Sequence, residues 1–356
     1  MKLRKVHLNT AATLEPVGSV LVIYTGGTIG MVFDKTGQHL VPFKFEQIME
    51  KMPELRQLNI DLSLISFARP IDSSDVTDAD WIVLSYIIQQ HYDDFDGFVI
   101  LHGTDTMAYT ASALSFLLEN LQKPVIFTGA QVPIGKMRTD ARENLITALE
   151  IATSTSRGIC IVPEVCIYFG DLLLRGNRSK KVESSHFNAF KSTNYPLLAQ
   201  AGVEIEYHAK NIRPLPTGPF KAHQVLDNRV VRLRLFPGLS EHVIRNLVLT
   251  ENLQGVVLES YGSGNAPTAR WFLDAMQTAI DRGTFILNVS QCDGGRVHQG
   301  KYQNSKYLHD MGIIGASDIT SEAAVTKLMF VLGQNLPYEE TRRLLQTDLR
   351  GEMTVE

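Results

Sequence analysis

The sequence has 356 residues, a length typical of two domains of ordinary size. Hydrophobic residues make up 44% of the chain and charged residues 20%, as in soluble globular proteins, and the net charge of −4 gives no electrostatic basis for binding nucleic acid. No apolar run reaches the length of about 18 residues that a transmembrane helix requires, so we expect no contact with a membrane.

The chain contains three cysteines, Cys160, Cys166 and Cys292. Because this count is odd and low and no C-x-x-C is present, neither a disulfide framework nor a zinc site is expected, and we predict three reduced and mostly buried thiols. Residues 6–18 lack the sustained apolar run of a signal peptide. These features predict a cytoplasmic protein.

The first half of the chain alternates between strand and helix patterns. Residues 1–17 are expected to form a loose extension, followed by a buried strand over 19–24, which is rich in β-branched residues. The next clear element is a helix that begins at Thr77, where Thr77 and Asp80 fit a capping box. The later elements predicted in this half are strands over 97–101, 124–127, 159–162 and 165–169 and helices over 107–118 and 139–152.

Residues 206–224 contain three prolines and no periodic pattern, so we interpret them as a linker between domains. The second half repeats the alternation, with strands predicted over 255–258 and 284–289 and helices over 240–248, 268–280, 321–332 and 338–345. This alternation is typical of α/β folds with a mostly parallel sheet. The sequence therefore predicts an N-terminal domain over 1–205 and a C-terminal α/β domain over 225–356.

Three glycine-containing turns, at 25–30, 102–106 and 128–130, directly follow predicted strands. Because ligands of such folds bind beyond the carboxyl ends of the strands, we expect the three turns to converge on one crevice. The first turn lacks the spacing and the lysine of a P-loop and does not fit G-x-G-x-x-G. Its glycines would let the backbone approach a ligand closely and leave N–H groups to point at an anion.

The polar residues of these turns each have a structural alternative. Thr28 stands where a hydroxyl could attack a substrate, or it could simply cap the next element. Asp105 is a candidate N-cap for the helix that begins near Met107. His102 is interpreted as a core histidine with satisfied hydrogen bonds rather than as a catalytic base.

Two further polar segments have similar alternatives. Residues 72–75 precede the helix at Thr77 and are either a plain polar loop or a clamp for the α-groups of an amino acid. The basic run 175–181 is either a solvated loop or the carrier of a lysine that takes a proton from a threonine, which would need a partner carboxylate. The sequence contains no H-E-x-x-H and no G-x-S-x-G motif.

In combination, these motifs resemble those of bacterial-type L-asparaginases of the cytoplasmic type I branch. The resemblance covers about residues 19–350 and is carried by segments 24–30, 102–107, 115–120, 128–131, 175–178 and 260–267. It implies two α/β domains: a larger N-terminal catalytic domain, with a mixed or parallel sheet flanked by helices, and a smaller C-terminal domain that is flavodoxin-like or Rossmann-like.

The resemblance implies hydrolysis of L-asparagine to L-aspartate and ammonia through a threonine nucleophile and an acyl-enzyme intermediate. It requires neither a metal nor an organic cofactor, and weaker glutaminase activity can accompany it. The residues given catalytic roles by the resemblance are Thr28, Thr104, Asp105 and Lys181. Those implied to bind substrate are Gly27, Asp72, Ser73, Gly103, Thr104, Asp105 and, through its carbonyl, Ala130. Which threonine attacks first is left open.

The resemblance also implies a homotetramer, built as a dimer of dimers, in which Asn265 reaches a neighbouring subunit's site. Two departures from the family pattern are present. The lid tyrosine is absent from 34–39, where Gln38 or His39 could replace it. At the positions of a known effector site the chain has Lys180, Glu259 and Cys292, and a glutamate in place of an arginine argues against that site.

Two other functions are considered. One is an amidase for glutamine or for a glutaminyl group on transfer RNA. The transfer-RNA enzyme carries an extra N-terminal domain, whereas only about 18 residues precede the first predicted strand here, so we rank this function low. The other is a non-catalytic amino-acid sensor. Binding alone would not require Lys181 together with both threonines, so the enzyme is favoured.

Overall fold

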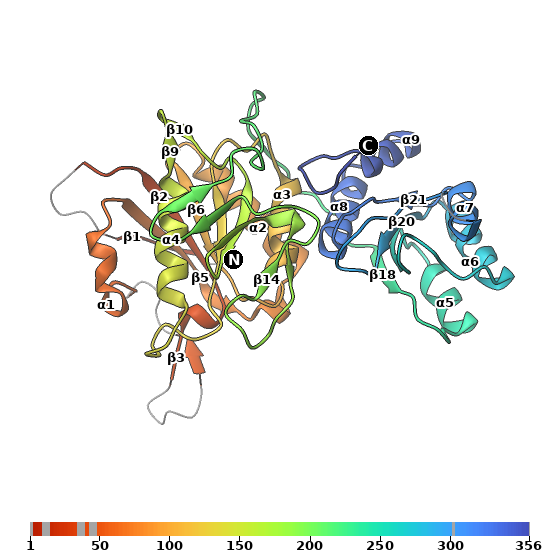
Figure 1. Cartoon of the computed structure of the whole chain (residues 1–356), viewed down its shortest axis with the longest axis horizontal. Coiled ribbons are helices and arrows are strands. Elements are labelled where there is room, and N and C mark those ends of the chain that lie inside the picture. Colours follow the sequence, from red (N-terminus) through yellow and green to blue (C-terminus); the bar gives the residue numbers. More distant parts are fainter. Residues whose placement is uncertain (1–2, 9–14, 34–39, 43–47, 301–302, 356) are drawn as a thin grey trace. The chain divides into compact units, whose positions relative to one another are not determined.

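The computed structural model describes residues 3–8, 15–33, 40–42, 48–300 and 303–355. The chain folds into two compact units, which are described separately (Figure 1). Unit 1 comprises Met1–Ser192 and Pro196–His223, and unit 2 comprises Thr193–Tyr195 and Gln224–Glu356. Both units are α/β, and the predicted fold class is confirmed.

Unit 1 is built on a nine-stranded mixed sheet with the order β1-β5-β2-β6-β8-β11-β12-β15-β16. The five strands from β5 to β11 run parallel, whereas β1 at one edge and the strands from β12 to β16 at the other pair antiparallel to their neighbours. The strands are β1 (Leu3–Leu8), β2 (Ser19–Gly26), β5 (Asp61–Ile71), β6 (Gly97–Leu101), β8 (Val125–Thr128), β11 (Val165–Phe169), β12 (Leu172–Arg175), β15 (Ala199–Ala201) and β16 (Ile205–Tyr207).

The central strands are buried along their length, as expected for parallel strands with both faces covered. Helix α4 (Ala141–Thr153) packs on β6 and β8, and α3 (Met107–Leu117) packs on β11. Helix α2 (Asp78–Gln90) contacts α3 and starts with the predicted capping box of Thr77 and Asp80. Unit 1 also contains the short helix α1 (Ile48–Lys51).

The N-terminal segment corrects one expectation. Residues 3–8 are not a loose extension but the edge strand β1, which pairs antiparallel with β5 from Leu3↔Phe67 to Leu8↔Leu62. Its partner β5 was also missing from the predicted elements. Strand β1 carries charged side chains and is largely exposed, a pattern that is common on edge strands and that hides the apolar signal of a strand.

Unit 2 is built on a four-stranded parallel sheet with the order β18-β19-β20-β21. Its core contains Val256, Leu258, Phe272, Met276 and Ile286 among others. The strands are β18 (Val230–Arg234), β19 (Gly255–Ser260), β20 (Phe285–Ser290) and β21 (Ile314–Gly315). The helices are α5 (Glu241–Val248), α6 (Arg270–Asp281), α7 (Gln303–Asp310), α8 (Ser321–Gly333) and α9 (Tyr338–Gln346). Strands β18 and β21 and helix α7 were not predicted.

The segment interpreted as a linker is in contact with unit 1 at both ends. Strand β16 pairs with β15, and β17 (Lys221–Ala222) pairs with β7 (Leu118–Glu119). The division between the units falls after His223. That 206–224 acts as a linker stays a prediction.

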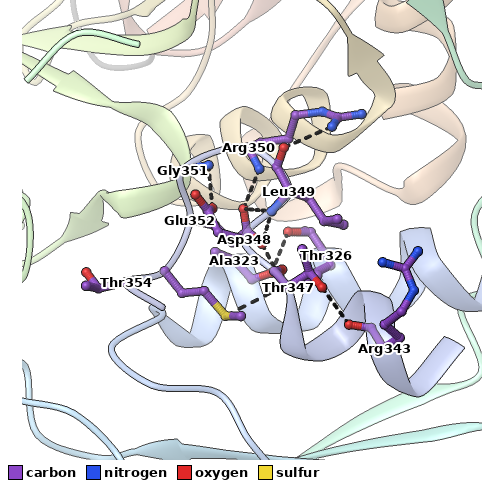
Figure 2. Close-up of polar contacts among 12 residues, drawn as sticks. Ala323, Thr326, Arg343, Thr347, Asp348, Leu349, Arg350, Gly351, Glu352 and Thr354 are labelled. Carbon is purple, nitrogen blue, oxygen red and sulfur yellow. Dashed lines mark hydrogen bonds and ion pairs between the residues drawn. The ribbon is translucent and has the colours of Figure 1, made fainter. Parts of the chain in front are cut away.

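The C-terminal tail is anchored to α8 by a buried ion pair, and Figure 2 shows the tail around Glu352, with Leu349 and Arg350 close to it. Lys327 and Glu352 have fully buried side chains, and Lys327 Nζ lies 2.6 Å from Glu352 Oε1. Lys327 Nζ also donates to the Thr347 carbonyl at 2.6 Å, while the Glu352 carboxylate accepts from the backbone N–H groups of Leu349 and Arg350. The charges at both ends of this pair are therefore supported by further hydrogen bonds, which a buried ion pair needs.

A three-residue piece of chain from outside the C-terminal half belongs to unit 2. Asn194 Nδ2 donates to the carbonyls of Gly295 and Asp318, each at 3.0 Å, and Asn194 Oδ1 accepts from the Gly295 N–H at 2.9 Å. Asp318 in turn accepts two hydrogen bonds from Thr354 of the tail. Asn194 thus connects two loops of unit 2 that are far apart in sequence.

Candidate active site

The register of the sheet aligns the ends of four strands in unit 1. Tyr24 of β2 pairs with Leu101 of β6, Leu101 pairs with Thr128 of β8, and Gly26 pairs with Ile71 of β5. The three turns that follow β2, β6 and β8 therefore lie at one edge of the sheet, as the sequence predicts. A fourth turn, after β5, joins them.

The turn after β2 lies directly against the turn after β6. Gly27 has φ of 88°, and a Cβ atom placed on it would come within 2.5 Å of the Gly103 nitrogen. Thr28 follows in the short 3-10 helix Thr28–Gly30, whose N-cap is Gly27, so Thr28 does not act as its cap. The lid positions 34–39, with Gln38 and His39, lie outside the described residues.

A lysine bridges the hydroxyl and the carboxylate of the turn after β6. Lys181 Nζ donates to Thr104 Oγ1 at 2.8 Å and to Asp105 Oδ1 at 2.6 Å. The Lys181 side chain is 17% exposed and that of Asp105 is 64% exposed, so the pair opens to solvent on the Asp105 side. Helix α3 has Thr106 as its N-cap, and the alternative of Asp105 as the cap is wrong. The lysine has the partner carboxylate that a proton-transfer role requires.

Beneath this turn, His102 is a fully buried structural residue. Its Nδ1 lies 2.7 Å from the Gly103 carbonyl and its Nε2 lies 3.0 Å from Thr110 Oγ1, which also accepts from Trp81 Nε1 at 3.0 Å. Since a carbonyl only accepts, Nδ1 carries the proton, and Nε2 accepts from Thr110. Burial lowers the pKa of His102 to about 4, which keeps the ring neutral near pH 7. The interpretation as a satisfied core histidine is confirmed.

The turn after β5 packs on the same backbone. Ser73 is buried, and its hydroxyl lies against Gly103: a Cβ atom placed on Gly103 would come within 2.6 Å of Ser73 Oγ. The Ser73 carbonyl accepts a hydrogen bond from Thr106 Oγ1 at 2.6 Å. Asp72 is exposed and caps the 3-10 helix Ser73–Asp75, accepting from the N–H and hydroxyl of Ser74. These hydrogen bonds lower the pKa of Asp72.

The basic run 175–181 is not a solvated loop, because most of it is buried. Arg175 forms a two-point ion pair with Glu164, Nε to Oε2 at 2.5 Å and Nη2 to Oε1 at 3.2 Å, and both side chains are 4% exposed. Ser179 Oγ donates to the Arg175 carbonyl, and Lys181 then pairs with Phe190 in a short two-stranded sheet. The lysine is therefore held by buried structure on both sides.

The turn after β8 contains a contact that the sequence did not indicate. Ala130 is buried, and the next residue, Gln131, places its Oε1 3.3 Å from Thr104 Oγ1. The backbone of this turn is fixed from α4: Asp140 accepts from the N–H groups of Gln131 and Val132, and Asn144 Nδ2 donates to the Gly129 carbonyl. No sequence motif or residue spacing indicates that the side-chain amide of Gln131 would contact Thr104.

Of the other residues singled out from the sequence, Lys180 lies in unit 1, where it pairs with Lys191, and Glu259, Asn265 and Cys292 lie in unit 2. Glu259 is buried and pairs with Arg232 at 2.8 Å and Arg234 at 3.7 Å across the neighbouring strand. Asn265 closes a tight turn by pairing with Tyr261. The three cysteines are free, as expected, but Cys292 is exposed, so the prediction of mostly buried thiols does not hold for it.

In unit 1, burial raises the pKa of Cys160 to about 11 and that of Cys166 well above its ordinary value. Among the described residues, no helix is both long and apolar enough to cross a membrane. Within the same part of the chain, no group of three or more histidine, cysteine, aspartate or glutamate side chains is arranged to hold a metal ion.

The structure thus has two α/β units, and in unit 1 a hydroxyl, a lysine and a carboxylate meet at the strand ends, as in an enzyme that activates a hydroxyl nucleophile. Residues 19–213 match the family model "Asparaginase, N-terminal", and residues 229–345 match "Glutaminase/Asparaginase C-terminal domain". The chain belongs to the asparaginase family and is a hydrolase that acts on an amide bond.

Individual relatives are similar over nearly the whole chain. L-asparaginase 1 of Escherichia coli is 42% identical, over 94% of this chain and 98% of its own. The crystal structure of L-asparaginase I from Vibrio cholerae has a TM-score of 0.85 at 40% identity, covering 95% of this chain and 99% of that one. The thermostable L-asparaginase from Thermococcus kodakarensis has a TM-score of 0.86 at 33% identity, covering 95% and 100%.

Proposed function

We propose that the protein is an L-asparaginase that hydrolyses the side-chain amide of L-asparagine to L-aspartate and ammonia. The observation that carries the proposal is the position of Lys181 Nζ, within hydrogen-bond distance of both Thr104 Oγ1 and Asp105 Oδ1. A threonine hydroxyl is a weak nucleophile until a base activates it, and a lysine beside a carboxylate can serve as that base.

The mechanism proceeds in two half-reactions. In acylation, a threonine oxygen attacks the amide carbon, the carbon–nitrogen bond breaks, and the amide nitrogen takes up the proton released by the threonine and leaves as ammonia. In deacylation, water attacks the ester and restores the hydroxyl. Lys181 in its neutral form takes the proton from Thr104, and Asp105 stabilises the ammonium that results.

A negative oxygen develops in both half-reactions, and it needs hydrogen-bond donors. The backbone of the turns at Gly27 and Gly103 lies at the same sheet edge as Thr104, and we propose that its N–H groups supply this stabilisation. Asp72, Ser73 and Asp105 would hold the α-amino and α-carboxylate groups of the substrate, and Ala130 would contribute its carbonyl. Thr28, next to Gly27, is the second threonine of the proposal.

The experiment is ammonia release by the purified protein from L-asparagine and from L-glutamine across substrate concentration. We expect turnover of asparagine, with weaker turnover of glutamine, because one extra methylene is usually discriminated by only ~1–3 kcal/mol. Turnover of asparagine should be lost in three variants, Thr28→Ala, Thr104→Ala and Lys181→Met. The Lys180→Met variant should retain it. No release from either amide by the wild-type protein would overturn the proposal.

The order of attack is accessible to the same variants. Mass spectrometry of each threonine variant, quenched after incubation with L-asparagine, would show which remaining hydroxyl still takes up the acyl group. We further propose a cytoplasmic location and a homotetramer, in line with the resemblance to type I asparaginases. Sedimentation velocity tests the second of these, and a monomer at micromolar concentration would contradict it.

A further inference from the structure

The contact between Gln131 and Thr104 has a defined polarity. Gln131 Nε2 donates to the His186 carbonyl at 3.1 Å, so the amide oxygen must be the atom that faces Thr104 Oγ1. An amide oxygen only accepts, and the Lys181 ammonium on the other side of Thr104 only donates. The single hydroxyl hydrogen of Thr104 therefore points to Gln131, and a lone pair of Oγ1 points to Lys181.

The position of Gln131 is set by rigid neighbours. Its backbone N–H donates to Asp140 Oδ2 at 2.9 Å, and the next N–H, of Val132, donates to Asp140 Oδ1 at 3.0 Å. Thr139 Oγ1 donates to the Val132 carbonyl at 2.8 Å. The residues at the start of α4 thus fix the backbone of the turn, and the amide is tied at its nitrogen. The 3.3 Å between Gln131 Oε1 and Thr104 Oγ1 is long for an O–H···O hydrogen bond.

We propose that Gln131 is a positioning residue for Thr104 in the reaction proposed above, on which this inference rests. Gln131 holds the hydroxyl hydrogen while Lys181 is an ammonium, and this selects the rotamer that keeps Oγ1 against Nζ. When Lys181 is neutral, its nitrogen lone pair competes with the Gln131 oxygen for the same hydrogen. The proton then leaves Oγ1, the O–H bond breaks as an N–H bond forms on Nζ, and Gln131 returns to accepting it at the end of the cycle.

Two variants test the assignment through steady-state kinetics with L-asparagine. Gln131→Leu removes the acceptor at similar size, and we expect kcat to fall roughly 3- to 10-fold with KM unchanged, the loss of one hydrogen bond. Gln131→Glu keeps an acceptor but adds a negative charge near Lys181, which favours the ammonium. We expect the rise of kcat/KM with pH to lie at higher pH in this variant than in the wild type. Above that rise, kcat should return to the wild-type value.

The matched control is Gln277→Leu in α6. It loses a comparable side-chain hydrogen bond, to Asp281, at a position far in sequence from the turns of unit 1. This variant should behave as the wild type. Thermal unfolding of each variant separates loss of fold from loss of function. If Gln131→Leu does not fold, the pH profile of Gln131→Glu decides the question.

Wild-type kcat in Gln131→Leu, an effect on KM alone, or an unshifted pH profile in Gln131→Glu would overturn the role of Gln131 while leaving the asparaginase proposal intact. A wild-type protein without activity on asparagine would overturn both.

Discussion

Gly27 and Gly103 approach so closely that neither turn could be shifted without the other: a Cβ on Gly27 would lie 2.5 Å from the Gly103 nitrogen and 2.6 Å from its Cα. Only glycine combines this approach with a φ of 88°. The two proposed catalytic threonines each follow one of these glycines directly. Their mutual placement is therefore set by backbone packing.

We predict that Gly27→Ala lowers kcat/KM for asparagine about 100-fold, because a displacement of about 1 Å in a catalytic group can cost that much. Ammonia release measures the loss of activity, and urea unfolding shows how far the variant is also destabilised. Gly158→Ala is the control, since Gly158 has φ of 77° and nothing within 4 Å of its added Cβ, so it carries the backbone strain alone. Equal activity in both variants would contradict the packing argument.

The Arg175–Glu164 ion pair gives a second prediction. Replacing Glu164 with Gln removes the carboxylate charge that pairs with the buried Arg175 guanidinium, and we expect the free energy of unfolding to fall by about 3–5 kcal/mol. Activity should fall as well, because the chain runs from Arg175 through the buried turn to Lys181. Glu340→Gln, which breaks an exposed pair with Arg343, should leave both quantities near wild type. A Glu164→Gln protein as stable as the wild type would be the contrary result.

The lowered pKa of buried His102 leads us to predict that the protein loses stability in mild acid. Its pKa is about 4 in the folded chain, against 6.5 when unfolded, so only the unfolded chain binds a proton between these values. Stability that is present above pH 6.5 is therefore lost as the pH falls to about 4, by up to about 3 kcal/mol. Urea unfolding of His102→Gln between pH 7 and 4 should show a shallower pH dependence than wild type, while the exposed His242→Gln should not. Parallel slopes for all three proteins would exclude His102 as the source.

From the Lys327–Glu352 ion pair we predict a second loss of stability, at lower pH than that caused by His102. Burial alone would raise the pKa of Glu352, but the Lys327 ammonium and the hydrogen bonds around it lower the pKa to about 2. Its contribution to stability is present above about pH 4.5, the unfolded value, and is lost as the pH falls toward 2.

Lys327→Met should therefore destabilise the protein by about 3–5 kcal/mol at pH 7, because it leaves the Glu352 carboxylate buried alone. The double variant Lys327→Met/Glu352→Leu should recover a large part of that loss, because it removes both charges from the core. Differential scanning calorimetry measures the change. A double variant no more stable than Lys327→Met alone would show that the pair is not what anchors the tail.

The sequence indicated four parallel strands of unit 1 (β2, β6, β8 and β11) and two of unit 2 (β19 and β20), because strands buried on both faces read as continuous apolar runs. The same criterion missed β1, which is exposed and basic, and β5, whose apolar positions are interrupted by Ser63 and Ser66 although both serines are buried. An edge strand and a serine-containing strand gain their burial from partners that are distant in the chain.

For the site, the sequence placed the turns at one sheet edge and proposed Lys181 as the partner of a threonine and a carboxylate, and the structure brings Lys181, Thr104 and Asp105 together. Capping and solvation arguments were less successful: Asp105 is not a cap, and the run after Arg175 is mostly buried. Gln131 was not identified because its role depends on a contact across 27 residues, with its polarity fixed by a third segment at His186.

The three residues around Asn194 make unit 2 discontinuous along the chain. A fragment that begins after the interdomain boundary would contain all four strands and five helices described for this unit, but it would lack the amide that connects the loop at Gly295 to Asp318 and, through Asp318, to the C-terminal tail. The C-terminal half is thus a structural unit without being an independent stretch of sequence. Proteolytic separation of the two halves would remove a connection from the C-terminal one, whereas a circular permutant with its new ends elsewhere would retain it.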